Sequence, residues 1–441
     1  MIRTHRAAAA VLTAALLAPA TAACAPGGGS TAADARSAAS SASTTSTASA
    51  PSGASDSTAS GSSEAAAVKR GKHLSLPRPT GKWAVGRDTL HLVDKDRRDP
   101  WVPSAGARRL MVSVFYPARR GGPRQSAAPY MSAKEAGLLL KGLKLDKSFP
   151  PDLLASVRTH ARIGARPAPG RHPLVVLSPG FTLHRATLTT LAEELTSHGY
   201  VVALLDHAYE SFGTTFTPRG SAGAGKGSAR TLTCVACETV EAAPDDKGEK
   251  KLLARAARNR AADISFAVDA LTTPAPEHSR DYAELIDTRR IGAAGHSLGG
   301  NAAAVAAGTD RRIRAAADLD GTFFAPVPQA GLGRPILMLG TEDGHNPRAE
   351  DRTWPRTWQR LDGWKRWLTV ADSGHFTFID LPILGGQAGV TDPSAPLSGK
   401  RSGEITTQYV KAFFDSRLRG LHRPLLDGPS KENPEVTFHT P

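Results

Sequence analysis

The sequence predicts an α/β fold with a mainly parallel sheet and helices on both faces. Short apolar runs alternate along the chain with stretches of helical spacing, which is the order expected when helices connect parallel strands. These runs are apolar at nearly every position, as in strands that are buried on both faces, rather than at every second position. The 441 residues are enough for one large domain with its own core.

Each predicted strand is a short run of apolar and β-branched residues, bounded by residues that favour turns or solvent. The second of them ends at a Pro-Gly pair, which stops a strand. In chain order the predicted strands are 108–117, 172–180, 200–207, 290–296, 313–320, 335–340 and 365–370.

Three longer stretches have the spacing of amphipathic helices. They are 188–199, which ends at a glycine, 252–271, and 404–418. We expect the last of them to pack on the sheet, because its apolar side chains recur near one face: Ile405, Tyr409, Phe413 and Leu418.

The N-terminus predicts a signal peptide over residues 1–23. A charged start precedes a short apolar core at 7–17, which cannot span a bilayer. The small residues that follow fit cleavage after Ala22 or, as we favour, a lipoprotein site that places lipid on Cys24. Residues 24–71 are mostly Ser, Thr, Ala and Gly, which predicts a flexible tether. We therefore expect an exported protein, held on the outer side of the cell membrane as a lipoprotein or secreted.

The remaining residues, 72–441, are predicted to form the folded domain, with an insertion at about 214–251. Cys234 and Cys237 lie in this insertion, and in an exported protein such a pair predicts a local disulfide. A zinc site would need further ligands, and the chain has no second cysteine pair.

The formal net charge of +14 raises the question of nucleic-acid binding. The basic residues are scattered, however, and no run of them is interleaved with aromatic residues. We therefore interpret the charge as a solvated basic surface and expect no nucleic-acid partner. The protein is expected to be a monomer.

The stretch Gly295-His296-Ser297-Leu298-Gly299 matches the motif G-x-S-x-G. An apolar strand precedes it and an alanine-rich helix follows it, which is the setting of the nucleophile turn in α/β-hydrolases. We therefore predict an α/β-hydrolase fold with Ser297 as the nucleophile.

A serine hydroxyl needs a base to take its proton, and the base needs an acid to orient it. In this fold the order along the chain is serine, acid, histidine. His375 follows the strand 365–370, where the base is expected. Asp320 and Asp343 each follow a predicted strand between the serine and the histidine, so the pattern leaves the acid open.

An oxyanion hole requires two N–H groups directed at the developing negative charge. The N–H of Leu298, directly after the serine, is predicted to supply one of them. The second is predicted to come from Phe181, in the loop after the strand 172–180.

The chain resembles the platelet-activating-factor acetylhydrolase-like lipases, within the α/β-hydrolases and near the dienelactone hydrolases and bacterial cutinases. The shared stretches include "HPLVVLSPGF", "GHSLGG", "DLDGTFF" and "SGHFTFID", and the resemblance extends over about 82–438 except at the insertion. In that family the acid lies in an L-D-[GA] context, which Asp320 matches, and Asp343 becomes the alternative. The animal enzymes have His-Gly where this chain has Pro179-Gly180.

The resemblance implies an exported serine esterase or lipase that cleaves short-acyl carboxylic esters, including sn-2 acyl groups of phospholipids. It implies no cofactor and no metal. The expected partners are a small-molecule or lipid ester and, through lipidated Cys24, the membrane. A cutinase or polyester hydrolase is the alternative, and a non-catalytic surface lipoprotein is a third hypothesis.

Overall fold

The computed structural model describes residues 73–441, apart from 121–124, 218–227 and 275–279. The described residues all belong to one compact unit. The predicted signal peptide, the predicted tether and Cys24 lie outside the described residues. None of the described helices combines the length and the apolar character needed to cross a bilayer.

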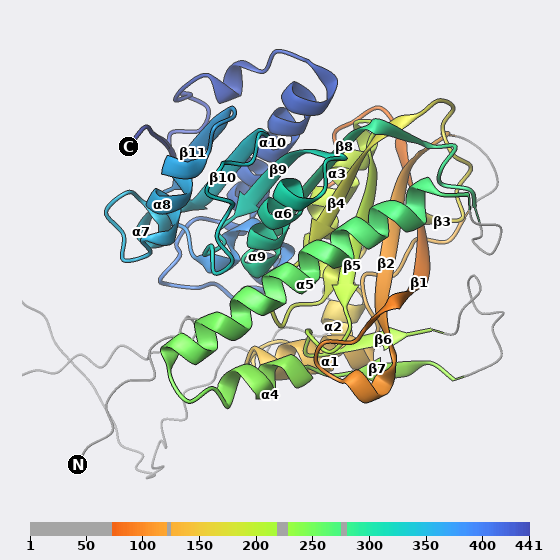
Figure 1. The fold of residues 1–441 in the computed structure, drawn as a ribbon. Helices are drawn as coiled ribbons and strands as arrows, with labels where there is room; N and C mark the ends of the chain where they lie inside the picture. The colour runs from red at the N-terminus through yellow and green to blue at the C-terminus, as the bar shows by residue number, and fades with distance from the viewer. Residues whose placement is uncertain (1–72, 121–124, 218–227, 275–279) are drawn as a thin grey trace, which may run out of the picture. The chain divides into compact units, whose positions relative to one another are not determined.

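Within the described residues, ten strands form one sheet in the order β12-β11-β10-β9-β8-β4-β5-β2-β1-β3 (Figure 1). A separate pair, β6 and β7, forms a hairpin. The strands are β1 (Ala84–Arg98), β2 (Ala107–Ala118), β3 (Arg162–Ile163), β4 (His172–Ser178), β5 (Val201–His207), β6 (Thr214–Phe216), β7 (Arg230–Leu232), β8 (Ile286–His296), β9 (Ile313–Leu319), β10 (Ile336–Thr341), β11 (Lys365–Val370) and β12 (Val436–His439).

The centre of the sheet, from β5 through β4, β8, β9 and β10 to β11, is parallel. Antiparallel pairing begins at β2 on one side and at β12 on the other. The predicted fold class, a mainly parallel sheet with helices, is therefore confirmed. β1 is missing from the predicted strands because charged residues interrupt its apolar positions, and its long pairing with β2 stabilises it instead.

Helices cover both faces of the sheet and create two apolar cores. Residues of α1, α3, α9 and α10 share one core, and residues of α5, α6 and α8 share the other. Figure 1 shows α5 and α6 crossing the near face of the sheet. The α-helices are α1 (Ala133–Gly142), α2 (Pro151–Ala155), α3 (Thr189–Ser197), α4 (Val235–Glu241), α5 (Asp246–Thr272), α6 (Leu298–Thr309), α7 (Glu342–His345), α8 (Thr353–Arg360), α9 (Asp380–Ala388) and α10 (Gly399–Arg419).

The predicted insertion is described except at 218–227. It contains the β6–β7 hairpin, α4 and the first turn of α5, so α5 begins earlier than the predicted helix 252–271. The Asp245 side chain accepts a hydrogen bond from the Gly248 N–H and caps this longer helix. The Ala236 N–H donates to the carbonyl oxygen of Tyr209 at 3.0 Å, which attaches α4 to the loop after β5.

The topology explains where chemistry can gather. β8, β9 and β11 are parallel strands with β10 between the last two, so their carboxyl ends lie at one edge of the sheet. Ser297 directly follows β8, Asp320 follows β9, and the loop with His375 follows β11. This edge is where open α/β sheets bind their ligands.

Candidate active site

Ser297 occupies a sharp turn between β8 and α6. Its backbone has φ 55° and ψ −127°, a conformation that non-glycine residues rarely adopt. The flanking glycines are needed for close packing: a Cβ at Gly295 would lie 2.3 Å from the backbone of Gly299, and one at Gly299 would lie 2.1 Å from the Ser178 oxygen. The strained turn leaves Ser297 half-buried rather than enclosed, as a nucleophile that meets a substrate requires.

Asp320, not Asp343, contacts the predicted base. The Asp320 Oδ2 atom lies 2.6 Å from Nδ1 of His375. Asp343 lies on α7 with an exposed side chain, and among the described residues no hydrogen bond or ion pair joins it to His375. Burial would raise the pKa of Asp320, but the charge and hydrogen bond of His345 and the contact with His375 hold this pKa well below its usual range.

His375 is held next to the serine turn by its neighbour His296. The Nε2 atom of His296 lies 2.7 Å from the His375 carbonyl oxygen, and the two rings are 4.6 Å apart. Burial and the nearby His375 lower the pKa of His296 to about 3, so His296 is neutral and donates through Nε2. No hydrogen bond between Ser297 Oγ and His375 is present among the described residues; in enzymes without substrate this bond is often long.

The two predicted oxyanion donors lie at the expected places. Leu298 is the first residue of α6, and Phe181 follows β4 in the loop that also contains Pro179. Neither N–H has a hydrogen-bond partner among the described residues. The next residue, Thr182, has a positive φ of 74° and is fixed by a hydrogen bond from its N–H to the Glu210 carbonyl oxygen at 2.9 Å.

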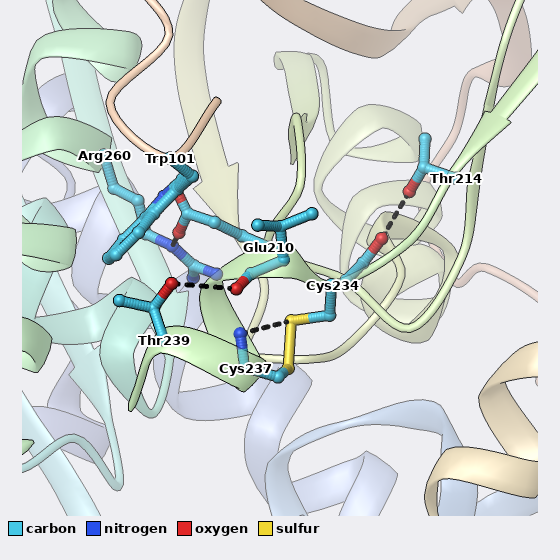
Figure 2. The surroundings of a disulfide bond; sticks show 9 residues. Trp101, Glu210, Thr214, Cys234, Cys237, Thr239 and Arg260 are labelled. Carbon is cyan, nitrogen blue, oxygen red and sulfur yellow. Dashed lines mark hydrogen bonds and ion pairs between the residues drawn. A yellow bond between two sulfur atoms is a disulfide. The ribbon is translucent and has the colours of Figure 1, made fainter. Parts of the chain in front are cut away.

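A buried ion pair supports this loop, and sequence reasoning did not find it. Arg260 of α5 donates through Nη1 to the Pro179 carbonyl oxygen and through Nε to Glu210 Oε2, both at 2.6 Å. Figure 2 shows Arg260 and Glu210 side by side next to Trp101, whose Nε1 also donates to Glu210, at 2.9 Å. Arg260 lies on the apolar side of the predicted helix 252–271. Because buried charges are normally paired, this position could have predicted a buried ion pair.

The predicted cysteine pair is a disulfide in the structure. Cys234 and Cys237 are joined with an S–S distance of 2.06 Å, and Cys237 N–H donates to Cys234 Sγ at 3.2 Å at the start of α4 (Figure 2). The helix they begin is bonded to the Tyr209 carbonyl oxygen. The disulfide therefore stabilises a segment that contacts the residue next to Glu210.

The second carboxylate oxygen of Asp320 faces His345. Sequence reasoning also missed this histidine, although it lies only two residues after Asp343. Among the described residues, no group of three or more His, Cys, Asp or Glu side chains is arranged to hold a metal ion.

Comparison with known proteins identifies the family of this chain. Residues 68–391 match the family described as platelet-activating factor acetylhydrolase, isoform II. The probable 1-alkyl-2-acetylglycerophosphocholine esterase of Arthroderma benhamiae is 27% identical over an alignment of 395 residues that covers 82% of this chain and 93% of that protein. The platelet-activating factor acetylhydrolase of Cavia porcellus is 23% identical over 61% of this chain and 64% of its own length.

A solved structure is similar over most of the domain. The ferulic acid esterase from Streptomyces cinnamoneus matches with a TM-score of 0.70 and 41% sequence identity, over 83% of this chain and 99% of that chain. The named relatives are esterases or acetylhydrolases, so this chain is a carboxylic ester hydrolase. It belongs to the platelet-activating factor acetylhydrolase isoform II family of the α/β-hydrolase fold.

Proposed function

We propose that this protein is a serine esterase that works through Ser297, His375 and Asp320. The observation that carries the proposal is the 2.6 Å contact between Asp320 and His375 beside the strained serine turn. In the first half-reaction, Ser297 Oγ attacks the ester carbonyl while His375 Nε2 takes its proton. Asp320 holds the ring through Nδ1 and stabilises the imidazolium that forms.

The N–H groups of Phe181 and Leu298 then stabilise the negative oxygen of the tetrahedral intermediate. Collapse of this intermediate breaks the bond to the alcohol, which leaves with the proton from His375. A water molecule, deprotonated by His375, releases the acyl group from Ser297 in the second half-reaction.

We propose short-acyl esters as the substrate class, including the sn-2 acyl group of phospholipids. The family match and the named activity of the Arthroderma benhamiae relative support this choice. A second candidate is an ester of a hydroxycinnamic acid, because the ferulic acid esterase is more similar in sequence than either acetylhydrolase-type relative named above.

The first experiment tests the nucleophile. A fluorophosphonate probe is expected to label the wild-type protein stoichiometrically and not to label Ser297→Ala. The matched control is Ser178→Ala, which changes a fully buried serine and is expected to label normally. Labelling of Ser297→Ala equal to the wild type would refute the proposed mechanism.

The second experiment tests the substrate class. The wild type is assayed on p-nitrophenyl esters of increasing chain length, on 1-alkyl-2-acetylglycerophosphocholine and on methyl ferulate. We expect kcat/KM to be highest for acetyl and other short-acyl esters. A clear preference for methyl ferulate would favour the second candidate, and release of soluble products from a polyester film with little activity on phospholipid would favour a polyester hydrolase.

We also propose that the protein is exported and carries lipid on Cys24. The support is the sequence pattern at 1–23 and the polar stretch at 24–71. In a bacterial host, Cys24→Ala is expected to move the protein from the membrane fraction to the soluble exported fraction. Identical fractionation of the variant and the wild type would argue for ordinary cleavage instead.

A further inference from the structure

Asp320 has two carboxylate oxygens, and the proposed catalytic mechanism uses only one of them. Its Oδ2 atom faces His375, whereas its Oδ1 atom accepts hydrogen bonds from the Thr341 N–H at 2.6 Å and lies 2.7 Å from Nδ1 of His345. Asp320 also has a positive φ of 59° directly after β9. The strained backbone is therefore held in place by contacts with Thr341 at the end of β10 and with His345 at the end of α7.

His345 lies between two carboxylates. Its Nδ1 atom faces Asp320, and its Nε2 atom lies 3.2 Å from Oδ2 of Asp351. Since a carboxylate only accepts, both ring nitrogens are expected to carry protons, which makes His345 an imidazolium. Its side chain is 7% exposed, so solvent screens this charge weakly.

The ring of His345 cannot easily turn away from these partners. It stacks on Trp354 at 4.3 Å with an interplanar angle of 24°, and its carbonyl oxygen accepts a hydrogen bond from Trp367 Nε1 at 2.7 Å. Asp351 is fixed in turn by hydrogen bonds from Thr322 and Thr353. The arrangement is built from several elements and does not depend on one loop.

The protonation of the surrounding groups agrees with this geometry. Burial alone would lower the pKa of His345, but attraction to Asp320 and hydrogen bonds to Asp320 and Asp351 raise it to about 10. Attraction to His345 contributes to holding the pKa of Asp320 well below its usual range. Burial raises the pKa of the neighbouring Asp318 well above its usual range, so this carboxyl adds no charge.

Few other titratable groups of the described structure lie near Asp320 and His375. His296, packed on the other side of His375, is neutral because burial and His375 lower its pKa to about 3. Glu342 and Asp343 share α7 with His345, but their side chains are exposed. The charged neighbours of Asp320 are therefore His345 with Asp351 behind it, and His375 whenever it is protonated.

We infer that His345 is a charged positioning residue, which holds Asp320 and sets the position of the acidic limb in the pH profile of kcat/KM. This inference rests on the proposed function of Ser297, His375 and Asp320. The positive charge on His345 offsets part of the negative potential that Asp320 exerts on His375. Removing this charge is therefore expected to move the acidic limb of the pH profile to higher pH.

The test is the pH profile of kcat/KM for p-nitrophenyl acetate, together with the pH dependence of fluorophosphonate labelling. His345→Asn retains a side-chain donor near the Nδ1 position but removes the charge. We expect the midpoint of the acidic limb to rise by about 0.5 to 1 pH unit. Asp351→Asn removes the negative charge on the far side of His345. It is expected to lower the midpoint of the acidic limb, by less than His345→Asn raises it.

Asp343→Asn is the matched control, because it removes an exposed carboxylate from the same helix. Its acidic limb is expected to coincide with that of the wild type. A His345→Asn enzyme that loses activity with an unmoved midpoint would overturn the inference and leave a merely structural role. Labelling that persists in Ser297→Ala would instead overturn the proposed function, so the two failures are distinguishable.

Thermal unfolding supplies a second readout that needs no substrate. Because the folded-state pKa of His345 is raised to about 10, its charge contributes stability that is fully present below the unfolded pKa of about 6.5 and is lost as pH rises through about 10. The difference in stability between the wild type and His345→Asn is therefore expected to shrink over this range. A difference that does not change with pH would show that His345 is uncharged in the folded protein.

Discussion

Among the described residues, a serine, a histidine and an aspartate are grouped in two places, one in the interior and one at the candidate site. In the interior, Ser178 Oγ lies 2.9 Å from His207 Nε2, and His207 Nδ1 lies 2.7 Å from Asp263 Oδ2. Of the three residues Ser297, His375 and Asp320, only His375 and Asp320 are joined by such a contact in the described structure, at 2.6 Å. The interior chain is therefore the more complete set of hydrogen bonds.

Access and backbone geometry separate the two groups. The interior residues are at most 2% exposed, and Ser178 is the last residue of the regular strand β4. The His375 side chain is 25% exposed, and the serine that precedes α6 occupies a strained turn. Beside it, the N–H groups of Phe181 and Leu298 have no hydrogen-bond partner in the described part of the chain. Hydrogen bonds among Ser, His and Asp are thus insufficient for catalysis. A substrate must also reach the serine hydroxyl, and free N–H donors must be positioned to bind the oxyanion.

The interior group has a structural role that its neighbours explain. Asp263 is paired with Arg108 and Arg97, and Ser178 directly precedes the loop with Pro179. Burial and the nearby Arg260 lower the pKa of His207, so this histidine bridges Ser178 and Asp263 as a neutral ring. We interpret the interior group as a support beneath the oxyanion loop.

The largest expected difference is between the two serines. Ser297→Ala is expected to lower kcat by roughly 10⁴-fold or more, because the nucleophile is lost. Ser178→Ala is expected to leave kcat within a few-fold of the wild type and to cost about 1 kcal/mol of stability through the lost hydrogen bond to His207. Steady-state kinetics and thermal unfolding measure both effects. A comparable loss of kcat in the two variants would erase the distinction drawn between the two groups.

The two candidate acids should differ almost as much. Asp320→Asn is expected to lower kcat by roughly 10³- to 10⁴-fold, because the amide favours the wrong tautomer of His375. Asp343→Asn is expected to keep wild-type kcat, since its carboxylate is exposed on α7. An intact Asp320→Asn enzyme paired with an inactive Asp343→Asn enzyme would reverse the assignment.

Variants of Arg260 test whether its buried ion pair with Glu210 positions the oxyanion loop. Arg260→Met removes the hydrogen bond to Pro179 and leaves Glu210 with fewer partners. We expect kcat to fall about 10- to 100-fold with a smaller change in KM, because the Phe181 N–H loses its fixed position. Breaking the buried pair is also expected to cost about 3 to 5 kcal/mol of stability.

The readout specific to this role is the affinity for an inhibitor that forms an oxyanion, such as a trifluoromethyl ketone. It should weaken in parallel with kcat, and Arg260→Lys should restore part of both. A variant that is less stable but binds this inhibitor as tightly as the wild type would limit Arg260 to a structural role.

The disulfide is expected to have the smallest effect. Replacing Cys234 and Cys237 together by serine opens a very short loop, so the chain-entropy contribution is about 2 kcal/mol. Activity is expected to fall only a few-fold, since α4 reaches the loop through one hydrogen bond from Ala236 to Tyr209. A loss as large as that of Arg260→Met would mean that α4, rather than the buried ion pair, is the main support of the loop.

Most of the fold and the candidate site could be predicted because the signals are local. The predicted parallel strands appear as β4, β5, β8, β9, β10 and β11, while charge-rich β1 was missed. Ser297 and His375 follow strand ends that the apolar pattern marks. The supporting residues carry no local signal: Glu210 and Arg260 are 50 residues apart in sequence, and each alone resembles an ordinary surface charge.

By itself, the sequence determined the fold class and the positions of Ser297 and His375 after their strands. It narrowed the acid to Asp320 or Asp343, and the family resemblance favoured Asp320. Tertiary structure decided that Asp320 contacts His375 and that His345 lies behind it. It also decided which of two Ser-His-Asp groups is open to a substrate. The physical reason is that exposure, and the pairing of buried charges, depend on packing between segments far apart in the chain, whereas strand and turn patterns depend on neighbours in the sequence.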